Sequence, residues 1–158
     1  MAALLLALTA VPSAAADLHQ LWDRQCGGCH GHAAQFARET LAVVDGHLRD
    51  RRSGREVEVF LQSHNGGYSP DIIAAMADML KAQSGTPELF KTRCGGCHET
   101  AAQLVREQLV EQDGQLVGIV SRRPLAEYLP DHADLSEDDV SLLLGVLWRI
   151  HGEVRRRP

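Results

Sequence analysis

The chain has 158 residues, enough for one ordinary domain or two small ones, and its apolar fraction of 44% is normal for a globular protein. Its formal net charge of -5 is spread evenly along the sequence, which argues against nucleic acid as a partner. Aromatic residues make up only 4% of the chain, so two small domains would have thin cores unless a cofactor supplied buried apolar surface.

The first 16 residues have the features of an export signal. An apolar stretch at 4–11 is followed by Ala14-Ala15-Ala16, a small-residue pattern suited to cleavage before Asp17. We therefore expect residues 1–16 to be a signal peptide and the mature protein to be periplasmic. The most apolar later run, 140–148, is too short to span a bilayer, so we expect no membrane anchor after processing.

The rest of the chain is a tandem duplication. Two Cys-Gly-Gly-Cys-His sequences, at 26–30 and 94–98, lie 68 residues apart, and many further identities recur at that same offset. The segment 83–87 has the Gly, Ser, Thr and Pro content of a linker. We predict two domains, 17–84 and 85–158.

Both halves are predicted to contain the same helices in the same order. Apolar residues at helical spacing, with a serine cap before each closing helix, favour opening helices at 18–23 and 87–91, second helices at 33–43 and 101–110, helical turns at 57–61 and 125–129, and closing helices at 70–81 and 137–151. Strand-type alternation is not convincing anywhere. The expected fold class is therefore all-α.

The two repeated motifs contain every cysteine of the chain. The pattern C-x-x-C-H is typical of covalent haem attachment, in which both cysteines form thioethers and the histidine ligates the iron. Paired disulfides, a zinc site and a thioredoxin-like redox pair are alternatives, but they leave the repeated histidine unexplained or need a different spacing or context. We predict two haem c groups, with thioethers at Cys26, Cys29, Cys94 and Cys97 and iron ligands at His30 and His98.

The second iron ligand is predicted from the repeat. His64 and His132 each lie 34 residues beyond the motif histidine, just before the closing helix. Met76 and Met79 align with apolar residues of the other half and are interpreted as core. We therefore predict bis-histidine ligation, with His30 and His64 on one iron and His98 and His132 on the other; His47 and His151 are the reserve candidates.

The motifs, followed by a helix, a distal ligand and a closing helix, resemble the small class I-like c-type cytochromes, and specifically a dihaem cytochrome built from two such domains. The resemblance implies tandem all-helical domains, each wrapped around one covalent haem c, with Trp22 and Phe90 against the closing helices. Members usually carry a distal methionine. A histidine in its place predicts comparatively reducing haems, because methionine ligation raises the potential.

These features predict an electron carrier without catalytic residues, which passes single electrons between partner proteins. A dihaem peroxidase-like oxidoreductase or a haem-based redox or gas sensor is the alternative, and either would require His64 or His132 to leave its iron. Four arginines recur between the halves and are candidates either to neutralise haem propionates or simply to face solvent: Arg38, Arg55, Arg106 and Arg123.

Overall fold

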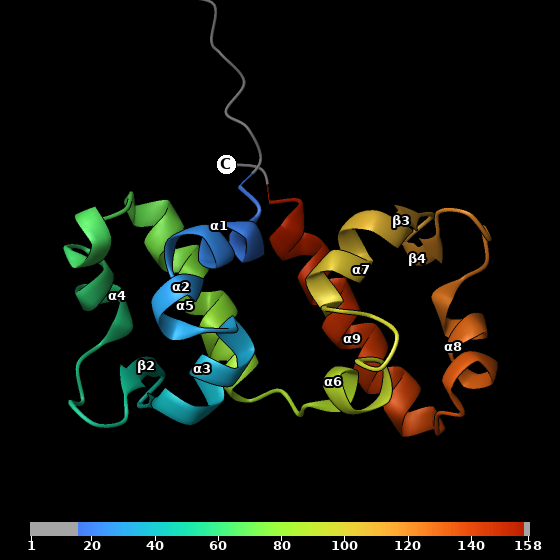
Figure 1. The fold of residues 1–158 in the computed structure, drawn as a ribbon, viewed down its shortest axis with the longest axis horizontal. Helices are drawn as coiled ribbons and strands as arrows, with labels where there is room; N and C mark the ends of the chain where they lie inside the picture. The colour runs from blue at the N-terminus through green and yellow to red at the C-terminus, as the bar shows by residue number, and fades with distance from the viewer. Residues whose placement is uncertain (1–15, 157–158) are drawn as a thin grey trace, which may run out of the picture.

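The chain folds into two similar lobes that lie side by side (Figure 1). The computed structural model describes residues 16–156, so the predicted export signal lies outside the described residues except for Ala16. In chain order the first lobe contains α1 (Leu18–Gln25), α2 (Gly27–His30), α3 (Ala33–Thr40), β1 (Leu41–Val44), β2 (His47–Asp50), α4 (Val57–Leu61), the 3₁₀ turn η1 (His64–Gly66) and α5 (Pro70–Ser84).

The second lobe repeats this order with two local differences. Its elements are α6 (Leu89–Arg93), α7 (Ala101–Gln108), β3 (Leu109–Gln112), β4 (Gln115–Gly118), α8 (Leu125–Ala133) and α9 (Glu137–Val154). The stretch equivalent to α2 is a turn, and His132 lies inside α8, whereas His64 begins a separate 3₁₀ turn. Figure 1 shows α4 and α8 at opposite ends of the molecule.

Side-chain caps begin three of the helices. The side chains of Asp17, Thr100 and Ser136 accept hydrogen bonds from backbone N–H groups in the first turns of α1, α7 and α9, which otherwise lack intrahelical partners. Three acidic residues, 137–139, also complement the helix dipole at the start of α9. Among residues 16–156, we find no helix whose length and apolar character would suit it to cross a membrane.

The prediction of an all-α fold is wrong, because each lobe contains a two-stranded antiparallel hairpin. Strand β1 pairs with β2, and β3 pairs with β4. Both hairpins are closed by an Asp-Gly turn in which the two residues have positive φ: 50° and 81° at Asp45-Gly46, and 52° and 75° at Asp113-Gly114. Positive φ at both central residues is the requirement of a type I′ turn, for which Asp-Gly is a preferred sequence.

The helices predicted at 33–43 and 101–110 run into the first strand of each hairpin, because the buried residues there continue the helical spacing. Ala33, Ala37 and Leu41 are all buried and lie four residues apart, although Leu41 belongs to β1 and not to α3. The four-residue strands are too short for alternation to stand out. The register places Leu41 opposite Asp50 and Leu48 opposite Val43, and in the second lobe Leu109 opposite Gly118 and Leu116 opposite Glu111.

The buried side chains form a separate cluster in each lobe. The first cluster joins Trp22 of α1 to Met76 and Met79 of α5, so the expectation that these methionines are core residues is confirmed. The second is built on the buried face of α9, and Phe90 packs partly buried against it. The contacts of α1 with α5 and of α6 with α9 agree with the placement that the resemblance implied for Trp22 and Phe90.

Reciprocal ion pairs join the two lobes. Arg38 of α3 pairs with Glu88, the N-cap residue of α6, and Arg106 of α7 donates through Nε to Oδ2 of Asp17, the N-cap residue of α1, at 2.8 Å. The two arginines occupy equivalent positions of the repeat, and each binds the residue that precedes the opening helix of the opposite lobe. A third contact joins Nε2 of His19 to the carboxylate of Glu153 at 2.8 Å, where α1 meets α9.

The left-handed conformation of the hairpin turns can be tested by mutation. Gly46→Ala is expected to lower the free energy of unfolding by about 1–2 kcal/mol, because an L-residue in the left-handed conformation is strained. Denaturant titration measures the change. Gly85→Ala is the matched control, since Gly85 has a φ of -98° and open space around the added methyl group. Equal losses for the two variants would contradict the hairpin geometry.

Candidate functional site

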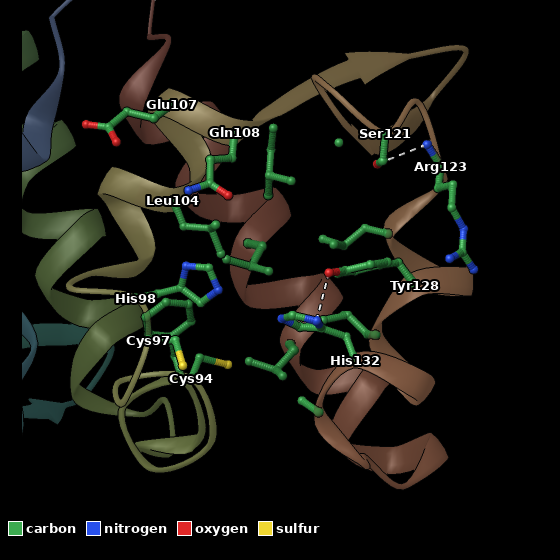
Figure 2. Close-up of a pocket in the computed structure, with 18 of the residues that line it drawn as sticks. Cys94, Cys97, His98, Leu104, Glu107, Gln108, Ser121, Arg123, Tyr128 and His132 are labelled. Carbon is green, nitrogen blue, oxygen red and sulfur yellow. Dashed lines mark hydrogen bonds between the residues drawn. The ribbon is translucent and has the colours of Figure 1, made fainter.

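In each lobe the motif histidine faces the predicted distal histidine across a cavity. The ring centroids of His30 and His64 are 6.1 Å apart, and those of His98 and His132 are 6.3 Å apart. The cavity between the first pair has a volume of about 630 Å³ and that between the second about 490 Å³. Figure 2 shows His98 and His132 on opposite walls of the second cavity, with Cys94 and Cys97 beside His98.

A single turn of backbone brings each motif histidine next to its cysteines. The N–H of His30 donates to the carbonyl of Cys26 at 2.9 Å, and the N–H of His98 donates to the carbonyl of Cys94 at the same distance. In the second lobe a Cβ on Gly95 would lie 2.5 Å from the carbonyl oxygen of Lys91. The first glycine of that motif is therefore required by the close approach of the preceding helix.

Apolar side chains from several helices and from the hairpin strand surround the two histidines of each lobe. The first cavity is lined mainly by Trp22, Phe36, Leu41, Val57, Phe60, Leu61 and Leu80. The second is lined mainly by Phe90, Leu104, Leu109, Ile119, Leu125, Leu129, Leu143 and Leu147. Concave apolar sites of about 300–1,000 Å³ with a few convergent polar groups are the usual setting for small-molecule and cofactor binding.

The motif histidine of the first lobe is held by aromatic neighbours. The Phe36 ring lies edge-on to His30 at a centroid distance of 4.7 Å, and Trp22 lies at 6.0 Å. Trp22 Nε1 also donates to the carbonyl of Gly31 at 2.8 Å, which fixes the chain just after the motif. The repeat does not point to Phe36, because the equivalent residue of the second half is Leu104, which is not aromatic.

Each distal histidine stacks on an aromatic ring that in turn lies beneath an arginine. These aromatic residues recur in the repeat, but the sequence did not indicate that they belong to the site. Phe60 stacks on His64 at 4.3 Å, and the guanidinium carbon of Arg55 lies 5.6 Å from the Phe60 ring centre. In the second lobe Tyr128 stacks on His132 at 4.5 Å, with Arg123 at the same 5.6 Å. Arg55 and Arg123 therefore line the cavities, whereas Arg38 and Arg106 join the lobes. The signal for this stack was the recurrence of Arg, an aromatic residue and His at equal spacing.

All four motif cysteines have free thiols, so neither motif forms a disulfide in this structure. Cys29 and Cys97 are exposed, whereas Cys26 and Cys94 are partly buried. Burial raises the pKa of the Cys26 thiol and of the Cys94 thiol, so both are protonated at neutral pH. The second cavity is lined by both of its cysteines and both of its histidines. The first is lined by Cys26 and the two histidines, whereas Cys29 is exposed and is not among the lining residues.

The reserve ligands lie elsewhere. Nδ1 of His47 is 3.9 Å from the carboxylate of Glu56, and His151 stacks on Trp148 at 5.9 Å. Burial lowers the pKa of His151. Among the described residues that line the two cavities, neither of these histidines appears.

Comparisons with known proteins leave the site to be interpreted from its own geometry. No family model matches the chain, and searches of curated proteins and of solved structures found no match. The resemblance to dihaem cytochromes therefore depends on the motifs and on the arrangement described above.

The Trp22 hydrogen bond is testable because a second tryptophan supplies a matched control. Trp22→Phe keeps an aromatic ring but removes the donor to Gly31, so we expect the free energy of unfolding to fall by about 0.5–1.5 kcal/mol as a part-buried hydrogen bond is lost. Trp148→Phe, at a side chain 44% exposed, should change it by less than about 0.5 kcal/mol. Thermal or denaturant unfolding measures both, and a Trp22→Phe variant as stable as the control would refute the role of this bond.

Proposed function

We propose that this protein is an exported dihaem electron carrier, with one covalently attached haem c between the two histidines of each lobe. The observation that carries the proposal is the spacing of the imidazoles, 6.1 Å and 6.3 Å between ring centres. An imidazole nitrogen binds a first-row metal at about 2.0 Å and the ring centre lies roughly 1.1 Å beyond it, so imidazoles on opposite sides of one ion have centres roughly 6.2 Å apart. Both pairs match this separation.

The donor set of each site fits a haem c. Cys26 and Cys29, or Cys94 and Cys97, would hold the group by thioether bonds, and two imidazoles would fill the two axial positions of its iron. The apolar walls suit a large planar ring, and both cavities fall within the usual range for cofactors. When bound, this group supplies a one-electron Fe(III)/Fe(II) couple.

The residues of the chain have three tasks in this proposal. The two imidazoles of each lobe would hold the iron from both sides, which would leave no position for a substrate. Phe36 restrains His30, and Phe60 and Tyr128 restrain the distal rings by stacking. The apolar lining limits the water around the redox centre, which together with fixed ligands keeps the reorganisation on electron transfer small.

Electron transfer with protein partners outside the cytoplasm follows from the same proposal. The signal expected at 1–16 would direct the chain to the periplasm. The partners are proposed to be a protein donor and a protein acceptor. A net charge of -5, to which haem propionates add, makes nucleic acid an unfavourable partner.

Spectroscopy of the haem-loaded protein tests the ligand assignment. We expect low-spin bis-histidine signatures from both haems in near-infrared magnetic circular dichroism, and a mass increase corresponding to two haems. His64→Ala should abolish the signature at one haem and His132→Ala at the other, because each removes one axial ligand. Leu142→Ala, on the exposed surface of α9, is the control and should change neither signal. A methionine-ligated or high-spin haem in the unmutated protein would contradict the assignment.

Carbon monoxide separates an electron carrier from the alternative functions. Iron with two imidazole ligands has no open position, so the reduced protein is expected to keep its absorption spectrum under carbon monoxide. His132→Ala should bind the gas at one haem only. Binding by the unmutated protein would instead favour a peroxidase-like enzyme or a gas sensor.

A further inference from the structure

The two distal histidines differ by one hydrogen bond. The hydroxyl of Tyr128 lies 2.7 Å from Nδ1 of His132, and Figure 2 shows this contact at the wall of the second cavity. The first lobe has Phe60 at the equivalent place, which offers no hydroxyl. Among the side-chain hydrogen bonds of the described residues, His64 takes part in none.

Apart from the hydroxyl, the two stacks are nearly the same. The aromatic ring lies 4.3 Å from His64 and 4.5 Å from His132, at interplanar angles of 29° and 27°. Arg55 and Arg123 lie at equal distances, 5.6 Å, over the aromatic rings. The molecule therefore contains an internal comparison in which the phenol oxygen is the one chemical difference within the stack.

The proposed ligation sets the direction of the hydrogen bond. If Nε2 of His132 faces the metal, Nδ1 carries the ring proton, so Nδ1–H donates to the Tyr128 oxygen. Donation from this outer nitrogen fixes the ring orientation and makes a metal-bound imidazole more basic. A more basic axial ligand stabilises the oxidised metal, and hydrogen bonding to the ligands is one of the means by which a protein lowers a haem potential.

We propose that Tyr128 is a positioning residue that makes the C-terminal haem the more reducing of the two. This inference rests on the proposed function. One electron would then pass favourably from the C-terminal site, whose iron would be oxidised, to the N-terminal site, whose iron would be reduced, with no bond made or broken and no net proton transfer. The near-duplicate lobes thereby acquire a direction for electron flow.

Redox titration of the full-length haem-loaded protein tests this inference. The unmutated protein should show two one-electron steps, and Tyr128→Phe should raise only the lower one, because the ring stack is kept and the acceptor is removed. We expect a change of up to about tenfold in the equilibrium constant for electron exchange between the haems, which is about 59 mV for a one-electron couple. The electron paramagnetic resonance signal of one ferric haem should shift with it.

The reciprocal variant keeps the test independent of the folding of Tyr128→Phe. Phe60→Tyr introduces the hydroxyl in the other lobe and should lower only the higher potential, and the double exchange should invert which haem is the more reducing. If both haems are bis-histidine ligated but neither variant moves a potential, this inference is wrong and the electron-carrier proposal stands. Absence of bis-histidine haem in the unmutated protein would overturn both.

Discussion

The constraint on which the rest of each lobe depends is that two imidazoles, 34 residues apart in the chain, face each other at about 6 Å. The motif histidine is placed by one tight turn after the opening helix. The chain must then come back to the cavity to place the distal histidine opposite, and it does so through a helix, a hairpin and a short helix. The closing helix α5 or α9 then packs against the second helix and holds both walls of the cavity in place.

The hairpins reverse the chain within the segment that connects each motif histidine to its distal histidine. A continuous helix over 33–43 would carry the chain away from the cavity, whereas the Asp45-Gly46 turn reverses it within two residues. One leucine from each strand is buried, so the hairpin also contributes to the lobe core. The same solution at Asp113-Gly114 shows that the duplication preserved the path of the chain as well as the motif.

The lobes share this frame but differ around their histidines. Trp22 and Phe36 surround His30, whereas Phe90 and Leu104 stand at the corresponding places in the second lobe. On the distal side they differ by the Tyr128 hydroxyl and by the backbone, because His132 lies inside α8 and His64 begins a 3₁₀ turn. Arg38 and Arg106 each form an ion pair with a residue of the opposite lobe. Ion pairs near the surface each add little stability, so these two contribute contacts between the lobes more than free energy of folding.

The sequence by itself determined the duplication, the order of helices and which histidines belong together, because the repeat compares each position with a second copy. Their role as iron ligands remains a proposal that the imidazole spacing supports. At 41–50 and 109–118 the sequence carries two conflicting signals: Asp45-Gly46 and Asp113-Gly114 favour hairpins, whereas the spacing of Ala33, Ala37 and Leu41 agrees with a continuous helix. The tertiary structure decided for the hairpins. The tertiary structure alone placed Phe36 on His30, because contacts between side chains of different elements depend on how those elements pack and leave no period in the sequence. The pair of Tyr128 and His132 has the four-residue spacing of a helix, but its hydrogen bond depends on the side-chain geometry that only the structure gives.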